Sequence, residues 1–289
     1  MKYKSYIIFI TLIILVLLNI NIYLKTINEY FQNINSICCV FVSNQKYFSK
    51  FVETCHELVI NGKYKGDICL VIGDDLKNNE LLNHKIIKNN NIIIKYFPDI
   101  KFPPEFYQVN NNLKTDGRNI TKKFQWHKLH LFNTYFKKWN GIFYIDCGMK
   151  ILDNIKPMLE IDYHNKLLAH SDAYPTYERK LSEQFDSSKK KIYQDLSNKY
   201  NLDIDYFQTG ILFYDTNIIK NNTFNNLLKI ALEYPISNTN EQGIMNIYFN
   251  CQKKIWKQIQ LKNDETNFYD YWSRNKNDNK YIIVKVKNW

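Results

Sequence analysis

Short, uninterrupted apolar runs separated by longer polar segments constrain this chain more than any other feature of its sequence. Such runs cover residues 37–42, 67–72, 92–96, 141–145, 167–169, 207–214 and 281–286. An apolar run of this length is typical of a strand that is buried on both faces. Between the first two runs, Phe48, Phe51 and Cys55 follow helical spacing. Strands that alternate with helices predict an α/β fold with a mixed, mostly parallel sheet flanked by helices.

Acidic residues follow several of the predicted strands. Asp74 and Asp75 come after the run 67–72, Asp146 follows 141–145, and Asp172 lies shortly after 167–169. Taken singly, each aspartate is best explained as a turn residue, because Asp is favoured in turns. Ligands of open α/β sheets, however, bind where the carboxyl ends of the strands open into loops. Several acids at one edge therefore favour a site that contacts a metal, a ribose or an acceptor hydroxyl.

The pattern over residues 121–139 predicts a helix with one apolar face. At about 100° per residue, Leu131, Tyr135 and Trp139 lie within about 60° of Phe124. Lys128 falls within this apolar face. Its ammonium group either reaches past the apolar surface to water, which is the common outcome, or points at an anion. His127 and His130 lie at the rim of the same helix, where we expect them to be solvated.

The first residues predict a membrane anchor. Residues 6–24 are apolar apart from a few hydroxyl and amide side chains, and Lys2 and Lys4 precede them. A helix of this length spans about 28 Å, close to the core of a bilayer. Positive residues favour the cytosolic side, so we expect a single-pass type II membrane protein with a lumenal domain, in a compartment such as the ER or Golgi. Residues 1–29 would be the uncleaved signal anchor and short stem, and residues 30–289 one domain; a cleaved signal peptide is the alternative.

Composition excludes several other classes of protein. A hydrophobic fraction of 45% excludes a disordered chain. The net charge of +11, with 22 Tyr and 18 Phe, raises the alternative of nucleic-acid binding. We expect no nucleic-acid partner, because most of these aromatic residues lie in predicted core segments and the domain would be lumenal. Six cysteines without a CxxC pair predict buried free thiols rather than a zinc site.

Several motifs occur in the order found in a known family. Lys128-Leu-x-x-Phe precedes Ile142-Phe-Tyr-Ile-Asp146-Cys-Gly148, and Phe207-Gln-Thr-Gly-Ile-Leu-Phe-Tyr and Asn240-Glu-Gln-Gly-Ile-Met-Asn246 follow. Their order and spacing resemble those of the GT-A glycosyltransferases, particularly the family 8-like nucleotide-diphospho-sugar transferases. The resemblance covers roughly residues 36–262. It implies a GT-A-like, Rossmann-related domain.

The resemblance also implies roles for individual residues. The nucleotide and its diphosphate would contact Val42, Ser43, Asp74, Lys128 and Asp146. The donor sugar would contact Gln208, Thr209, Gly210 and Gln242. The catalytic residues would be Asp146, Glu241 at the transferred sugar, and Asp172, which with His170 faces the acceptor. Without the resemblance, Gln242 also fits a capping box that begins at Thr239.

The chain departs from the family at the metal site. Asp146 matches the first acid of the family's DxD motif, but Gly148 stands where the second acid, the usual manganese ligand, would be. Ile282 stands in the place of the histidine of the family's closing motif. Asp146 and the phosphates alone would hold a metal weakly. Two alternatives stay open: a divalent cation, Mn²⁺ or Mg²⁺, or metal independence, with Lys128, Lys285 or Lys287 supplying part of the positive charge.

The resemblance implies a glycosyltransferase of the hexosyltransferase type. It would move a sugar from a nucleotide-diphosphate donor, with UDP-sugars among the candidates, to a glycan or glycoprotein acceptor. The missing second acid motivates an alternative: a catalytically inactive, transferase-like module that binds a glycan or a nucleotide.

Overall fold

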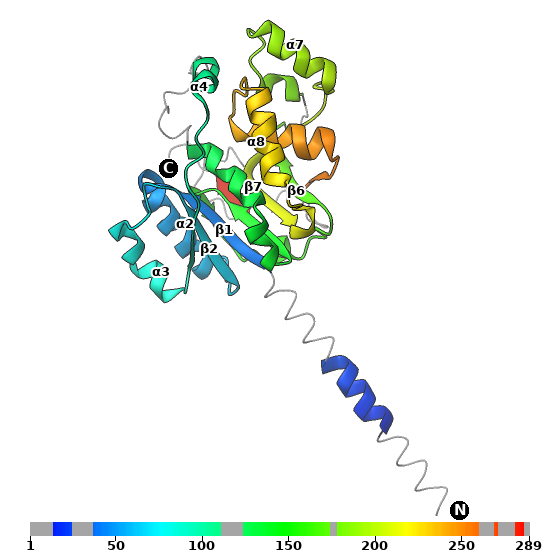
Figure 1. Cartoon of the computed structure of the whole chain (residues 1–289). Helices are drawn as coiled ribbons and strands as arrows, with labels where there is room; N and C mark the ends of the chain where they lie inside the picture. Colours follow the sequence, from blue (N-terminus) through cyan, green and yellow to red (C-terminus); the bar gives the residue numbers. More distant parts are fainter. Residues whose placement is uncertain are drawn as a thin grey trace, which may run out of the picture.

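The computed structural model describes residues 14–24, 37–110, 124–173, 178–259, 269–270 and 281–285. Within them, six of the predicted strands and the additional strand β8 form a seven-stranded sheet of order β3-β2-β1-β4-β7-β6-β8 (Figure 1). Its strands are β1 Ile37–Ser43, β2 Asp67–Ile72, β3 Ile93–Tyr96, β4 Gly141–Ile145, β6 Leu167–Ser171, β7 Phe207–Asp215 and β8 Trp256–Gln258. Strands β1 to β4 are parallel, β7 is antiparallel to β4 and β6, and β8 is parallel to β6. The predicted mixed, mostly parallel sheet is confirmed.

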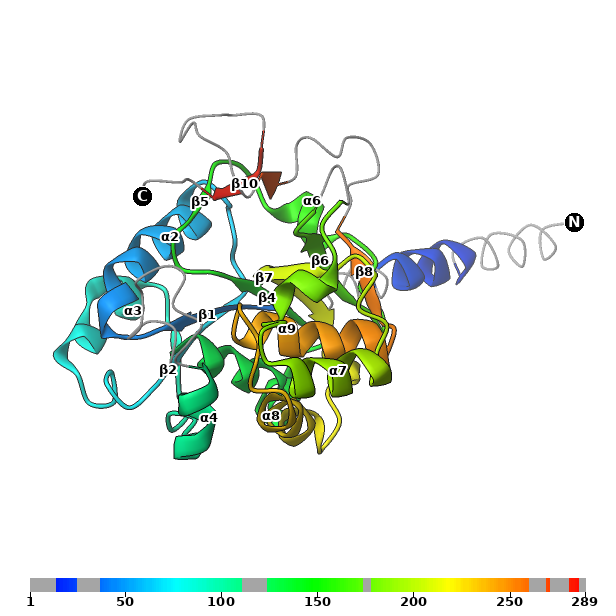
Figure 2. The same cartoon turned by 90° about the horizontal axis from the view of Figure 1, so that it is seen from above.

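Each face of the sheet buries its own layer of apolar side chains, because side chains alternate along a strand. In β1, for example, Val40 joins one cluster, and Cys39 and Phe41 join the other. Figure 2 shows the sheet between the two groups of helices. One face is covered by α4 (Pro104–Asn110), α7 (Lys190–Lys199), α8 (Thr223–Glu233) and α9 (Glu241–Met245), and the other by α2 (Phe48–Ile60), α3 (Lys85–Asn89) and α6 (Lys156–Leu159).

Short helical segments connect these elements. The 3₁₀ segments η1, η2, η5 and η6 cover Gln45–Tyr47, Glu80–Asn83, Leu181–Gln184 and Thr216–Ile218. Helix α9 is followed directly by a π-helical segment, η7 (Asn246–Gln252).

The predicted helix over 121–139 is wrong in its form. Residues 111–123 lie outside the described part of the chain, and the rest consists of two 3₁₀ segments, η3 (Trp126–Phe132) and η4 (Thr134–Lys138). Asn133 separates them because its backbone is extended and its side chain caps η4, accepting a hydrogen bond of 3.0 Å from the Tyr135 backbone nitrogen. All seven side chains of η3 are buried, so this segment has no solvated face.

The two histidines of η3 are buried, which contradicts the prediction that they are solvated. His127 places Nε2 3.1 Å from the carbonyl oxygen of Ile72. The His130 ring stacks on Phe97 and on Phe224, at 4.5 and 4.7 Å between ring centroids. Burial lowers the pKa of His130 to about 3, so this ring is neutral at physiological pH.

The cysteines are free thiols, as predicted. Five of the six are buried. Burial raises the pKa of Cys55, Cys69 and Cys147 to about 12, so these side chains are protonated and behave as small apolar groups.

A second, three-stranded sheet lies beside the loop that follows β4. Its strands are β5 (Met149–Ile151), β9 (Tyr269–Asp270) and β10 (Ile283–Lys285), in the order β5-β10-β9. Strand β10 is antiparallel to β5, and this register places Lys285 opposite Met149. The end of the chain therefore returns to the loop that contains Asp146 and Gly148.

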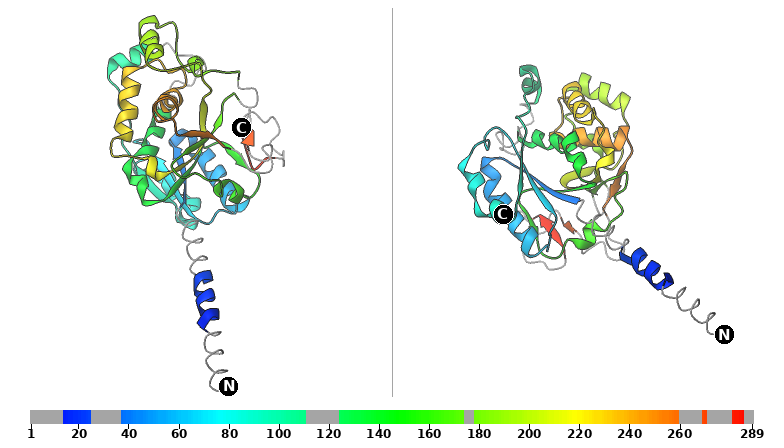
Figure 3. Two further views of the ribbon diagram at one scale, coloured as in Figure 1. Left: turned by 90° about the vertical axis from the view of Figure 1, so that its right-hand side faces the viewer. Right: turned by 60° about the horizontal axis from the view of Figure 1, so that its bottom comes forward.

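Near the N-terminus, residues 14–24 form a helical segment that projects away from the sheet (Figures 1 and 3). Its large apolar side chains are between 49% and 68% exposed. Among the described residues, no helix is both long enough and apolar enough to cross a membrane. Of the predicted anchor, residues 6–13 lie outside the described part of the chain.

Asn246 joins the start of β7 to α9. Its Oδ1 accepts a hydrogen bond of 3.0 Å from the backbone nitrogen of Phe207, and its Nδ2 donates to the carbonyl oxygens of Phe207 and Gln242 at 2.8 and 3.0 Å. The side chain is completely buried. The substitution Asn246→Ala removes all three of these hydrogen bonds, although the Gln242 carbonyl oxygen still accepts from the backbone nitrogen of residue 246. It is expected to lower the free energy of unfolding by about 3 kcal/mol.

Urea unfolding of the purified full-length chain, followed by circular dichroism, measures this loss. Asn225 is exposed on α8, and Asn225→Ala is the matched control, with an expected change within about 0.5 kcal/mol. Equal effects of the two substitutions would contradict the role assigned to Asn246.

Candidate functional site

The topology brings the predicted acids to one edge of the sheet. The carboxyl ends of β2, β4 and β6, which precede Asp74, Asp146 and Asp172, open at this edge because β6 and β4 both run antiparallel to β7. The first residues of β7 lie at the same edge for the same reason. The polar groups at strand ends therefore face a common region, as the sequence predicts.

Lys128 lies at the centre of this region and pairs with two carboxylates. Its Nζ is 2.8 Å from Asp146 Oδ1 and 3.2 Å from Glu241 Oε1. The side chain is only 11% exposed, so it does not reach to water. Burial alone would lower the pKa of the ammonium, but Asp146 and Glu241 outweigh burial and raise it. Of the two alternatives for Lys128, the one in which it points at an anion is confirmed.

Asp146 is held from two further sides. Its Oδ1 accepts a hydrogen bond from the Tyr144 hydroxyl, and its backbone nitrogen donates to the carbonyl oxygen of Gly210 at 2.8 Å. Burial would raise the pKa of this carboxyl, but the charges of Lys128 and Lys285 lower it below its usual range. Asp146 is therefore ionised at neutral pH.

Glu241 is buried and only partly satisfied. Oε1 accepts a hydrogen bond of 3.0 Å from the Thr209 hydroxyl in addition to its contact with Lys128. Oε2 is buried and has no hydrogen-bond partner among the described residues. Burial raises the pKa of this carboxyl, and the nearby charge of Asp146 adds to the effect. Because buried polar atoms are normally paired, Oε2 is a free acceptor for a ligand hydroxyl.

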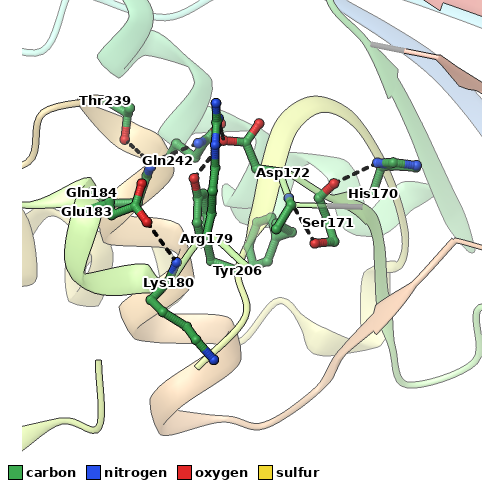
Figure 4. A network of polar contacts seen from close by, with 12 residues as sticks. His170, Ser171, Asp172, Arg179, Lys180, Glu183, Gln184, Tyr206, Thr239 and Gln242 are labelled. Carbon is green, nitrogen blue, oxygen red and sulfur yellow. Dashed lines mark hydrogen bonds and ion pairs between the residues drawn. The ribbon is translucent and has the colours of Figure 1, made fainter. Parts of the chain in front are cut away.

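Gln242 fixes the backbone of Thr209. Its Oε1 accepts a hydrogen bond of 3.1 Å from the Thr209 backbone nitrogen, and its Nε2 donates to Gln184 Oε1 at 2.9 Å. The Thr239 hydroxyl also donates to Gln184, and no side chain caps α9 (Figure 4). The alternative that Thr239 and Gln242 form a capping box is therefore wrong.

A second polar group surrounds Asp172. Its Oδ2 accepts hydrogen bonds from the Tyr206 hydroxyl at 2.7 Å and from Arg179 Nη1 at 3.4 Å. Figure 4 shows these three side chains turned toward one another, whereas His170 points away beyond Ser171. Asp172 is 13% exposed, and Tyr206 directly precedes β7. This group thus lies at the same strand end as Thr209.

A cavity of about 380 Å³ opens beside the ends of β1, β2 and β3. Asp74 lines it, and the Tyr96 hydroxyl donates to Asp74 Oδ1 at 2.6 Å. Val42 and Ser43, predicted to contact the nucleotide, are buried within β1. The walls also include Asn44, Asp75, Asp99, Tyr107, Phe124 and His127. The cavity therefore combines aromatic side chains with carboxylates.

Sequence reasoning missed several residues of the site. Gln184, Tyr206 and Asp99 contact predicted site residues only through the fold, and no local pattern marks them. Arg179 does carry a signal, because it is one of only three arginines in a chain rich in lysine. Tyr144 lies within the apolar run 141–145, where a tyrosine is expected to pack in the core, so its hydroxyl gave no separate signal.

The residues around Asp146 do not fit a divalent cation. Within the described part of the chain, no group of three or more His, Cys, Asp or Glu residues is arranged to hold a metal ion. One of the two carboxylate oxygens of Asp146, Oδ1, already contacts both Lys128 and Tyr144. Ile282 is a buried apolar residue, and Lys287 lies outside the described residues.

Comparisons with known proteins support the fold. No family model matches the chain, and no curated protein matches it. Among solved structures, it is similar to the bifunctional glycosyltransferase WbbM, with a TM-score of 0.57 and 14% identity over 88% of this chain and 46% of WbbM. It is also similar to the galactosyltransferase LgtC in complex with donor and acceptor sugar analogues, with a TM-score of 0.56 and 12% identity over 87% of each chain. The mannosyltransferase Ktr4p from S. cerevisiae, in complex with GDP, has a TM-score of 0.50 and 9% identity over 78% of this chain and 69% of that protein.

These likenesses define the class of fold. The chain has the GT-A fold of nucleotide-sugar glycosyltransferases. It spans less than half of WbbM but most of LgtC. Because the sequence identities are low, the narrower resemblance to family 8 stays a prediction.

Lys128 compensates two buried acids, and its removal should be costly. The substitution Lys128→Met is expected to lower the free energy of unfolding by about 3–5 kcal/mol at pH 7, since it removes the cation that contacts both Asp146 and Glu241. Their pKa values would then be higher in the folded than in the unfolded chain. The folded state would bind protons more tightly, so part of the lost stability returns as the pH falls toward the unfolded pKa values.

Urea unfolding at pH 7 and at pH 5 tests both statements. Lys229 is exposed on α8, and Lys229→Met serves as the control for loss of a lysine charge. A Lys128→Met variant as stable as this control at pH 7 would contradict the ion-pair account.

Proposed function

We propose that this protein is a glycosyltransferase that takes its sugar from a nucleotide-diphosphate donor. The observation that carries the proposal is the cluster of buried Lys128 and Glu241 with half-buried Asp146 at the open edge of a GT-A fold. One oxygen of Glu241 lacks a partner among the described residues, which favours a polar ligand at this point. WbbM, LgtC and Ktr4p are glycosyltransferases, which supports the same class of reaction.

The donor would lie along the strand ends of the first half of the sheet. The cavity lined by Asn44, Phe124 and His127 suits a nucleoside, because its aromatic rings supply stacking surface and its polar groups supply hydrogen bonds. Lys128 is the cation at the next strand end, where the diphosphate would follow. The unpaired Glu241 Oε2 would accept a hydrogen bond from a hydroxyl of the sugar. Thr209 and Gln242, which contact each other, would form the floor under that sugar.

The reaction would be a displacement at the anomeric carbon. The bond from this carbon to the diphosphate oxygen breaks, and its electron pair leaves with the diphosphate. An acceptor hydroxyl oxygen forms the new bond, and its proton passes to the oxygen of the leaving diphosphate. The ammonium of Lys128 would stabilise the charge that develops on the leaving diphosphate, because it is already in place and shielded from water.

The acceptor would lie toward Asp172. Its carboxylate is fixed by Tyr206 and Arg179 and is partly exposed, so it is placed to accept a hydrogen bond from a sugar hydroxyl. Residues of this kind, with planar and charged groups, suit a glycan or a glycoprotein acceptor. The panel of donors and acceptors described below identifies the donor sugar, the nucleotide and the acceptor.

Release of nucleoside diphosphate from a panel of UDP-, GDP-, ADP-, CDP- and dTDP-sugars, with and without candidate acceptors, tests the proposal. One donor is expected to be consumed, and Asp146→Ala is expected to slow its consumption by about 100-fold or more, because Lys128 loses the partner that positions it. Asp195→Asn, at an exposed site on α7, is the control and should leave the rate unchanged.

Wild-type turnover in Asp146→Ala would contradict the proposed site. Binding of a nucleotide sugar without any turnover, by a folded wild-type chain, would instead support the alternative of an inactive binding module.

We also propose that the apolar N-terminal segment anchors the protein in a membrane, with the domain in the lumen. The exposed apolar side chains of residues 14–24 support this, since the described residues leave them uncovered. The full-length chain, expressed in cells with a secretory pathway, is expected to remain with membranes after alkaline carbonate extraction. Replacing Leu15, Leu18 and Ile22 by Asp should release it, because charges at these positions oppose insertion. Release of the unchanged chain would contradict the anchor.

A further inference from the structure

The loop after β4 does not accommodate a second acid. Gly148 has a φ of 108°, a backbone conformation that only glycine adopts without strain. Its backbone nitrogen donates to Thr54 Oγ1 at 3.1 Å, which fixes this conformation against α2. A carboxylate residue at position 148 would have a strained backbone. The backbone conformation of this loop therefore favours glycine over an acidic residue at position 148.

Lys285 lies in the strand next to the loop that lacks the second acid. The register of β10 on β5 sets Lys285 opposite Met149, whose backbone nitrogen donates to the carbonyl oxygen of Asp146. The charge of Lys285 acts on both Asp146 and Lys128. Lys285 forms neither an ion pair nor a side-chain hydrogen bond with any described residue, whereas Lys150 in the neighbouring strand pairs with Glu57.

The charges around this position favour an anion. The charges of Lys128 and Lys50 act on Lys285, as does the opposite charge of Asp146, whereas Lys128 itself pairs with Asp146 and Glu241. Burial lowers the pKa of the Lys285 ammonium, and the nearby lysines add to this effect. A bound anion would remove that penalty, because it favours the protonated form.

We propose that Lys285 and Lys128 together bind the donor diphosphate in the place of a divalent cation. The inference rests on the proposed function, because the anion is the diphosphate of the nucleotide sugar. Asp146 then acts as a positioning residue that holds the Lys128 ammonium, rather than as a metal ligand. The two lysines would neutralise the leaving diphosphate while Glu241 contacts the sugar.

Binding of nucleoside diphosphates, measured by isothermal titration calorimetry on the full-length chain, tests this inference. The probes are UDP, GDP, ADP, CDP and dTDP, with the corresponding monophosphates, in EDTA and in Mn²⁺. We expect one diphosphate to bind in EDTA, with an affinity that Mn²⁺ changes by less than about threefold. Lys285→Met is expected to weaken its binding by about tenfold and to affect the monophosphate less, because a charged hydrogen bond to phosphate is lost.

Two further variants separate charge from folding. Lys285→Arg keeps the cation on β10 and should retain most of the affinity. Lys257→Met, at an exposed position of β8, should bind like the wild type. Diphosphate binding that requires Mn²⁺, or that is unchanged in a folded Lys285→Met variant, would overturn this inference alone. Absence of nucleotide binding under both conditions would overturn the proposed function and this inference together.

Discussion

The ion pairs of Lys128 with Asp146 and Glu241 are the interaction on which the site depends. Charges buried in a protein are costly unless each finds partners and further hydrogen bonds. Here the partners come from η3, the end of β4, β7 and α9, which are far apart in the sequence. The acids are further held by the hydroxyl groups of Tyr144 and Thr209. A single ammonium therefore sets the relative positions of four segments at the open edge of the sheet.

The sheet was predictable because its strands are buried on both faces. A strand of this kind is a short, nearly continuous apolar run, so its ends can be read from the sequence. The runs at 67–72 and 141–145 have the same bounds as β2 and β4. The segment over 121–139 failed for the opposite reason. Its apolar spacing suits an α-helix, but Asn133 caps a new segment and tertiary contacts bury both sides of η3. There the surroundings of the segment, rather than its own periodicity, decided the structure.

The centre of the site was predictable and its periphery was not. Lys128 was marked by its place in an apolar pattern, and Asp146, Thr209 and Glu241 by motifs with a fixed order. Their supporting residues, such as Tyr206 and Gln184, contact the site only because strands pair and loops close around it. Such contacts connect residues that are remote in the sequence and leave no local pattern. The position of Lys285 likewise depends on the pairing of β10 with β5.

The structure of the chain with a bound nucleoside diphosphate would test this account most directly. The account predicts both phosphates beside Lys128 and Lys285, with the base in the cavity lined by Phe124 and His127. It also predicts that this arrangement is found in crystals grown in the presence of EDTA. A nucleotide bound elsewhere, or phosphates that contact Asp146 only through a metal ion, would contradict the account.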